Sequence, residues 1–170
     1  WLRKTELTFG IDLAGASLHQ RGYRTDQVTA PLKENLAAAM LLNCGITQNT
    51  YDAILDPMCG SATLLIEAAS ILMKREPNAY RTKPGSPGWS GHVLKRFRQL
   101  RDACVDNERS WNPKTKLIGY DRDPKAVRIA RDNVESAGLT GIIHIEKRDV
   151  LDAPEQSIPF KGERGLVIVN

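Results

Sequence analysis

The chain has 170 residues, of which 41% are hydrophobic, so it is long enough for one domain with a buried core and short for two. Its 24 Lys and Arg residues exceed its 20 Asp and Glu residues, and the formal net charge of +4 is a mild indication of a polyanionic partner. No apolar run approaches the roughly 18 residues of a membrane span, and the three cysteines without C-x-x-C spacing argue against a disulfide framework and a zinc site, so we predict a cytoplasmic protein without a bound metal.

The first part of the chain is expected to form a β-hairpin or linker, over 1–29, ahead of a main domain that spans 30–170. Residues 7–13 alternate roughly with period two, and residues 17–24 can form a second strand after a turn of small residues. Because Trp1 is not a natural first residue and the chain stops directly after an apolar run, we interpret the sequence as a piece of a longer protein.

The main domain alternates helix and strand patterns. Helices are expected at 31–43, about 63–74, 92–107 and about 124–138, and strands at 53–55, 116–121, 142–146 and 165–170. A loop rich in proline and glycine interrupts this pattern between 76 and 89. The order predicts a Rossmann-like α/β fold, a mostly parallel sheet with helices on both faces. The first helix is expected to pack on the sheet with Leu32, Leu36, Ala39, Met40 and Leu42.

The turn that follows the first strand of this sheet is the most informative stretch. It consists of Asp56, Pro57, Met58, Cys59, Gly60, Ser61, Ala62 and Thr63. Between a buried strand and a helix, such small residues let a ligand approach the backbone, and the helix offers unpaired N–H groups. The turn therefore predicts a site for a nucleotide-type ligand.

Polar residues also end the next three strands. Asp121 follows the second strand, Asp149 the third and Asn170 the fourth. Because the carboxyl ends of parallel strands line one crevice, we expect these residues to lie together with the turn. Asp121 is placed to accept hydrogen bonds from ribose hydroxyls, and Asp149 to accept one from the exocyclic amine of an adenine.

A dehydrogenase is the first alternative, and the sequence argues against it. The turn has no G-x-G-x-x-G pattern, and the ribose acid Asp121 follows about 60 residues later instead of roughly 20. The acid at the first position of the turn, Asp56, suits a cationic or amine-bearing ligand better than a pyrophosphate.

Four blocks of the sequence closely resemble the THUMP-associated RNA guanine methyltransferases, whose site is a class I S-adenosylmethionine fold. The blocks are Asp56-Pro-Met-Cys-Gly-Ser-Ala-Thr-Leu-Leu-Ile-Glu-Ala-Ala, Asp12-Leu-Ala-Gly-Ala-Ser-Leu-His-Gln-Arg-Gly-Tyr-Arg, Ala30-Pro-Leu-Lys-Glu-Asn-Leu-Ala-Ala-Ala and Gly119-Tyr-Asp-Arg-Asp-Pro. The resemblance covers nearly the whole chain, and it is greatest to members that act on bacterial 23S rRNA.

The resemblance implies that S-adenosylmethionine is the cofactor. It assigns cofactor binding to Asp56, Pro57, Met58, Cys59, Gly60, Ser61 and Thr63 for the methionine part, Asp121 with Arg122 for the ribose, and Asp149 with Val150 for the adenine. Asn170 would be the first residue of the family's catalytic Asn-Pro-Pro-Tyr motif. The family usually has Gly in place of Ala62, whose methyl group is harmless if φ is negative and otherwise crowds the ligand.

A basic stretch runs from Lys74 to Arg101, with eight basic residues against one acid. A solvated helix face is the simplest explanation of such a run. Beside a methyltransferase site, and with aromatic residues interleaved, the stretch is predicted to contact RNA, in particular through Lys95, Arg96 and Arg98.

We therefore predict a catalytic domain that transfers a methyl group from S-adenosylmethionine to the exocyclic amine of a guanine in rRNA. The resemblance further implies 23S rRNA as the partner, a THUMP domain before this domain and a second methyltransferase domain after it. Two alternatives stay open: a tRNA guanine or DNA adenine amino-methyltransferase, and a module that binds RNA or S-adenosylmethionine without activity.

Overall fold

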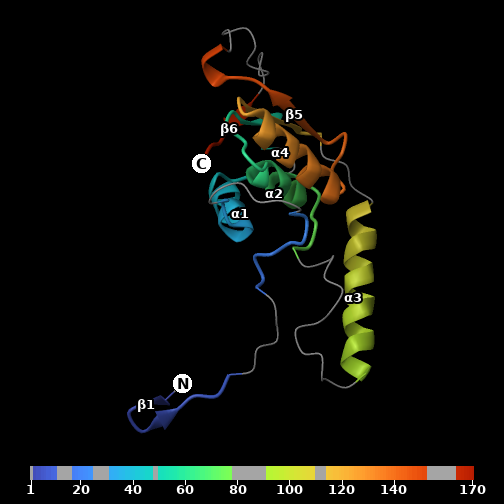
Figure 1. Ribbon diagram of the computed structural model, residues 1–170. Coiled ribbons are helices and arrows are strands. Elements are labelled where there is room, and N and C mark those ends of the chain that lie inside the picture. Colours follow the sequence, from blue (N-terminus) through green and yellow to red (C-terminus); the bar gives the residue numbers. More distant parts are fainter. Residues whose placement is uncertain are drawn as a thin grey trace.

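The computed structural model describes residues 2–10, 17–24, 31–47, 50–77, 91–109, 114–152 and 164–170. A parallel sheet of four strands, in the order β5-β4-β3-β6, forms the framework of the main body, in which Figure 1 labels β5 and β6. The strands are β3 (Ala53–Asp56), β4 (Lys116–Asp121), β5 (Ile143–Lys147) and β6 (Gly165–Val167). The four predicted strands and the parallel, Rossmann-like sheet are therefore confirmed.

The order of the strands reverses at β3. From β3 the chain moves through β4 to β5 on one side, and β6 then lies on the other side of β3. In open α/β sheets, ligands bind outside the carboxyl ends of the strands at such a switch point. The topology thus predicts a site between the turn that follows Asp56 and the residues that follow β6.

The described residues include four α-helices. They are α1 (Glu34–Asn43), α2 (Thr63–Leu72), α3 (Gly91–Arg109) and α4 (Pro124–Ser136). Because the chain moves in the same direction from β3 to β4 and from β4 to β5, crossovers of the usual right hand place α2 and α4 on the same face of the sheet, where both contact β4 and β5 (Figure 1). On β5, Ile143 and Ile145 are buried, whereas His144 between them is exposed. In the described part of the chain, the helices that cover the sheet therefore cover one face, and the predicted helix cover on the other face stays a prediction.

The buried face of helix α1 agrees only in part with the prediction, since Leu32 and Met40 are partly buried against the core. Leu36 and Leu42 are 51% and 60% exposed, whereas Glu34, Ala37 and Leu41 are buried. The reason is the neighbour of the helix, because α1 packs mainly against α2 and not on the sheet. The small Ala37 side chain lets the two helices approach each other closely.

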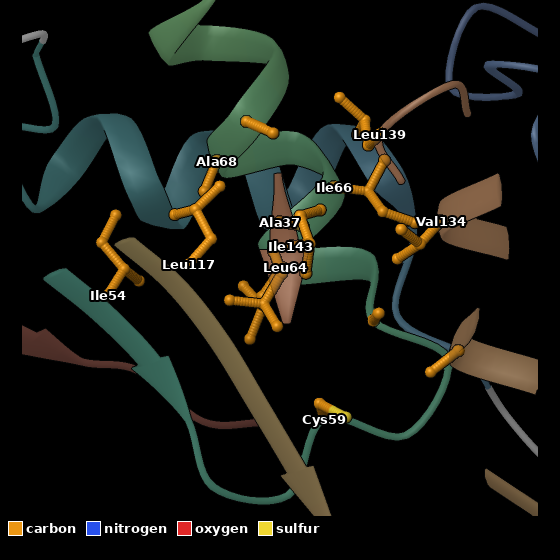
Figure 2. Close-up of a cluster of buried hydrophobic side chains, with 14 of the residues drawn as sticks. Ala37, Ile54, Cys59, Leu64, Ile66, Ala68, Leu117, Val134, Leu139 and Ile143 are labelled. Atoms are coloured by element: carbon orange, nitrogen blue, oxygen red, sulfur yellow. The ribbon is translucent and has the colours of Figure 1, made fainter. Parts of the chain in front are cut away.

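The hydrophobic core lies where α2 and α4 meet the sheet, and Figure 2 shows part of it, including Ile54 of β3 and Leu117 of β4. Gly119 of β4 belongs to this packing. A methyl group at its position would lie 2.7 Å from Leu65 Cδ1 and 2.8 Å from Ile145 Cδ1. Glycine therefore lets α2 lie directly on β4.

The N-terminal hairpin is present, but not at the predicted residues. The strand β1 (Leu2–Arg3) pairs antiparallel with β2 (Glu6–Leu7), and the pair lies away from the main body (Figure 1). Residues 17–24 do not form the predicted second strand, because a turn at their start and Gly22, with a φ of 94°, interrupt the extended backbone. Arg21 and Arg24 of this segment instead form ion pairs with helices α2 and α1.

Some predicted features fall outside the described residues. These are part of the predicted hairpin, at 11–16, the boundary predicted after residue 29, and most of the loop predicted over 76–89. The division of the chain at residue 30 stays a prediction.

Helix α3 stands beside the body of the molecule and apart from the sheet (Figure 1). Its Leu94 and Phe97 are half-buried, and its Leu100 is exposed. None of the helices in the described ranges is both long and apolar enough to cross a membrane.

Candidate functional site

The turn after β3 contains two residues in the left-handed conformation. Gly60 has a φ of 51° and Ala62 a φ of 63°, and the Ala62 amide donates a hydrogen bond to the Cys59 carbonyl at 2.7 Å. The Cys59 amide donates to the carbonyl of Tyr120 in β4 at 2.8 Å. Because α2 begins directly after the turn, at Thr63, its first N–H groups have no partner within the helix.

Asp56 ends β3 and is almost completely buried, with 2% of its surface exposed. Its Oδ1 accepts a hydrogen bond from the Met58 amide at 3.2 Å. Burial raises the pKa of the Asp56 carboxyl from 3.8 to about 7, although the Met58 hydrogen bond lowers it, and the negative charge of Asp121 raises it further. A buried carboxyl that titrates near neutrality beside a turn is typical of a functional site.

Asp121, at the end of β4, holds this turn in place. Its Oδ2 accepts a hydrogen bond from the Gly60 amide at 2.9 Å, and its Oδ1 accepts one from the Asp123 amide at 2.9 Å. Each carboxylate oxygen has a second lone pair. Asp121 can therefore fix the turn and still accept two hydrogen bonds from a ligand.

Asp149 follows β5 and lies near Asp121 along the sheet edge. The amide of Arg148, the residue before it, donates to the Asp121 carbonyl at 3.0 Å. Asp149 Oδ1 accepts from the backbone amide two residues further on at 3.0 Å. The Arg148 guanidinium lies over the ring of Tyr120, 4.5 Å from its centroid. These contacts fix the loop after β5 beside the loop after β4.

A cavity of about 100 Å³ opens between the turn, the segment before α1 and the end of β6. Its lining consists of Pro31, Leu32, Asp56, Met58, Cys59, Gly60, Ser61, Thr63, Leu64 and Asn170. The structure thus brings most of the turn together with Asn170. The other predicted site residues do not line this cavity, namely Pro57, Asp121, Arg122, Asp149 and Val150. Of these, Arg122 and Val150 are exposed.

Ala62 adopts a positive φ, the case in which its methyl group was expected to crowd a ligand. The residue is completely buried, belongs to the hydrophobic core and does not line the cavity. The methyl group therefore points into the core, and the expectation of crowding is wrong. The left-handed conformation costs only backbone energy, about 1–2 kcal/mol for a residue with a Cβ.

Sequence reasoning missed several residues that shape this site. Asn133 of α4 is completely buried, and its Nδ2 donates to the Ser61 carbonyl at 3.1 Å. Asn133 lies within the apolar stripe of α4, and this position could have predicted a buried hydrogen bond, because a buried amide needs a partner. The role of Leu32 in the cavity and the hydrogen bond from Arg24 to Thr63 Oγ1, at 3.0 Å, had no such local signal.

The Cys59 thiol stays protonated. Burial, and then the negative charges of Asp56 and Asp121, raise the pKa of this thiol. Cys59 therefore contributes its backbone and its volume to the turn. Among the side chains that the structure describes, His, Cys, Asp and Glu form no group of three or more that could hold a metal ion.

The basic residues predicted to contact RNA lie outside the cavity. Lys95, Arg96 and Arg98 are exposed on α3, apart from the sheet (Figure 1). Two other members of the basic stretch have partners within the protein. Arg75 donates to a backbone carbonyl after α4 at 2.8 Å, and Arg101 pairs with a neighbouring aspartate at 2.7 Å.

The functional groups of the site suit a nucleoside-like ligand that carries an amine. A buried carboxyl at Asp56 can pair with a cationic group, and the free lone pairs of Asp121 can accept from hydroxyl groups. Asn170 provides an amide oxygen and an amide N–H₂ at the same cavity.

Comparison with known families gives a match over most of the chain. The model of a family described as "RMKL-like, methyltransferase domain" matches residues 21–170. Two relatives named ribosomal RNA large subunit methyltransferase K/L, from Methylococcus capsulatus and Allochromatium vinosum, are each 42% identical to the chain over 97% and 98% of its length. The chain spans only 22% and 23% of the length of these relatives.

Two solved structures are similar to this one. A predicted N6-adenine-specific DNA methylase from Listeria monocytogenes has a TM-score of 0.77 and 32% identity, over 94% of this chain and 40% of that one. A proposed methyltransferase, solved in complex with S-adenosylhomocysteine (SAH), has a TM-score of 0.74 and 32% identity, over 94% and 39% of the two chains. Together with the strand order, these similarities confirm the predicted class of fold.

Proposed function

We propose that this chain, which belongs to the family of RMKL-like methyltransferase domains, transfers a methyl group from S-adenosylmethionine to a guanine in 23S rRNA. The acceptor is the exocyclic amine of the base. The observation that carries the proposal is the cavity at the switch point of the sheet, which joins the turn after Asp56 to Asn170. The names of the relatives support ribosomal RNA as the substrate, and the similar structure solved with SAH supports the cofactor.

The groups around the cavity fit the parts of this cofactor. The buried carboxyl of Asp56 and the backbone of the turn suit the ammonium and carboxylate groups of the methionine part. Asp121 has lone pairs for the two ribose hydroxyls, and Asp149 is proposed to accept from the adenine amine. Arg122 and Val150 adjoin these two acids and complete the proposed set.

The proposed reaction needs positioning more than a strong base. S-adenosylmethionine, when bound, supplies a methyl group on a sulfonium, which is a good leaving group. Asn170 is proposed to accept a hydrogen bond from the target amine and so to favour its pyramidal, nucleophilic form. Asn170 would thereby direct the amine nitrogen toward the methyl group that the bound cofactor would supply. Most of the rate enhancement comes from holding the two reactants in line.

Titration of the chain with S-adenosylmethionine and with SAH tests the cofactor part of the proposal. We expect calorimetry to show one binding site for each ligand. An Ala62→Gly variant is expected to bind with the same affinity, because the Ala62 methyl group does not line the cavity. Absence of binding heat in both proteins would remove the methyltransferase proposal for this chain.

A DNA adenine amine is the second candidate acceptor, because one similar structure is named as an N6-adenine-specific DNA methylase. The amide oxygen of Asn170 can accept from either amine. Transfer of labelled methyl groups to transcribed 23S rRNA, tRNA and duplex DNA, followed by mass spectrometry of the nucleosides, separates the candidates. We expect N2-methylguanosine from the 23S transcript, whereas N6-methyladenine from DNA alone would favour the second candidate.

Lys95, Arg96 and Arg98 are proposed to contact the RNA backbone. Replacement of Arg96 and Arg98 by Glu is expected to weaken RNA binding and to reduce the slope of log K against log salt by about 2, because each arginine releases roughly one counterion. The affinity for SAH should not change.

The matched control for this variant replaces Lys114 and Arg128 by Glu. Both residues are exposed, and the change in charge is the same. Filter-binding or fluorescence titrations at several salt concentrations measure both variants. Equal RNA affinity in the two variants would contradict a specific role for α3.

Further domains are proposed on both sides of this one. The chain covers less than a quarter of the relatives' length, which leaves room for a THUMP domain before residue 1 and a second methyltransferase domain after residue 170. Within the chain, we propose 30–170 as the methyltransferase domain and 1–29 as the segment that leads into it. We further propose that the enzyme acts in the cytoplasm.

A further inference from the structure

Two arginines of the segment 17–24 form ion pairs that are closely matched. Arg21 Nη2 lies 3.4 Å from Glu67 Oε2 of α2, and Arg24 Nε lies 3.1 Å from Glu34 Oε1 of α1. Both arginine side chains are 14% exposed, and the two glutamates are 4% and 6% exposed. The two pairs are alike in burial and charge, but Arg21 donates two hydrogen bonds of 3.4 Å to Glu67, whereas Arg24 Nε donates none to Glu34.

The two guanidinium groups differ in their other contacts. Arg24 Nη2 donates to the Leu32 carbonyl and also to Thr63 Oγ1, the latter at 3.0 Å. Thr63 Oγ1 in turn lies 3.1 Å from Ser61 Oγ. Leu32, Thr63 and Ser61 all line the cavity described above. Arg21 donates instead to the carbonyl of a residue in its own segment, at 2.9 Å.

We infer that Arg24 is a positioning residue that joins the two walls of the cofactor cavity, an inference that rests on the proposed function. One wall is the segment before α1, which includes Leu32, and the other is the turn that ends at Thr63. A single nitrogen of Arg24 donates to both walls. Beyond the packing of α1 on α2, this one half-buried side chain therefore helps to hold the separation of the walls, and with it the width of the cavity.

The chemistry of this contact calls for arginine. The guanidinium is planar and carries its N–H groups at fixed angles, so that Nη2 can serve two acceptors while the delocalised charge stays close to Glu34, with which Nε forms an ion pair without a hydrogen bond. A lysine has one ammonium group, which can pair with Glu34 but does not at the same time reach the Leu32 carbonyl and Thr63 Oγ1 in this geometry. Glu34 is 5% exposed and balances the buried positive charge.

The test compares Arg24→Lys with Arg21→Lys, which is the matched control. Both variants keep one positive charge beside a buried glutamate, so we expect both to fold with similar losses in melting temperature. The dissociation constant for SAH is expected to rise about tenfold in Arg24→Lys, because a charge-assisted hydrogen bond to the wall is lost. In Arg21→Lys it should stay at its original value.

A second measurement separates positioning from a general structural effect. In a Thr63→Val background, which has no hydroxyl for Arg24 to bind, Arg24→Lys is expected to cause a much smaller further loss of SAH affinity. Full additivity of the two substitutions, or equal losses of affinity in the Arg24 and Arg21 variants, would overturn the role of Arg24 and leave the proposed function standing. Absence of SAH binding in the unaltered chain would overturn both.

Discussion

Asp121→Ala is expected to abolish measurable binding of SAH in a chain that still folds. The substitution removes the acceptors for the Gly60 and Asp123 amides, and with them the lone pairs proposed for the ribose hydroxyls. Hydrogen bonds to a charged group contribute about 1.5–3 kcal/mol each. Loss of two such bonds to the ligand therefore corresponds to a decrease in affinity of roughly 100-fold or more. Calorimetric titration with SAH measures this decrease in affinity.

Asp123→Ala is the control for this variant, because it removes one negative charge from the same loop. Asp123 is exposed and caps α4, where its Oδ1 accepts from the Lys125 amide at 2.9 Å. Its loss is expected to cost about 1 kcal/mol of stability and to leave SAH affinity unchanged. Equal affinities in the two variants would argue against Asp121 as a cofactor ligand.

Asp56→Asn is expected to raise the melting temperature of the ligand-free chain at pH 8. Burial raises the pKa of Asp56 from 3.8 to about 7, so between these pH values the folded chain holds a proton that the unfolded chain has released. The free energy of unfolding therefore falls as the pH rises from 3.8 to about 7, and this carboxyl adds no further change above that. The asparagine still accepts from the Met58 amide and carries no charge.

The measurement is thermal unfolding, followed by circular dichroism, at pH 5 and at pH 8. The advantage of Asp56→Asn over the unaltered chain is expected at pH 8 and should shrink toward pH 5, where the aspartate is protonated in the folded state. The same difference at both pH values would show that the charge of Asp56 is not the cause.

The Asp56→Asn variant is also expected to bind SAH more weakly. If the proposed function holds, ionised Asp56 faces the ammonium group of the methionine part. The affinity of the unaltered chain for SAH should therefore increase with pH up to about 7, whereas the affinity of the variant should not. Glu67→Gln serves as the control, because burial also raises the pKa of Glu67 and this residue does not line the cavity. A more stable Asp56→Asn variant with full affinity would mark Asp56 as a residue of the fold alone.

The parts of the site with local signals were predictable from the sequence. The apolar run before Asp56 and the helix pattern after Thr63 placed the turn correctly, since both depend on neighbouring residues only. The start of α4 was also readable, because Asp123 and Pro124 form a typical helix N-terminus. The convergence of Gly60 with the end of β4 followed from the rule for parallel sheets.

The predictions that were wrong concern features that depend on which other part of the protein a segment packs against. Nothing within 34–43 tells whether α1 packs on a sheet or on α2, so its buried face was predicted only in part. The strand pattern of 17–24 was outweighed by its turn, and the contact of Arg24 with Thr63 joins segments 39 residues apart. The direction of the Ala62 side chain required the backbone angles of the turn.

The hydrogen bond between the Gly60 amide and Asp121 also makes the site depend on the folding of the whole sheet. It joins residues 61 positions apart, which the parallel pairing of β3 and β4 brings together. Closing so long a connection is slow compared with forming a local turn. The ligand-binding shape of the turn therefore depends on the pairing of β3 with β4. Once bound, the ligand stabilises only the completed sheet.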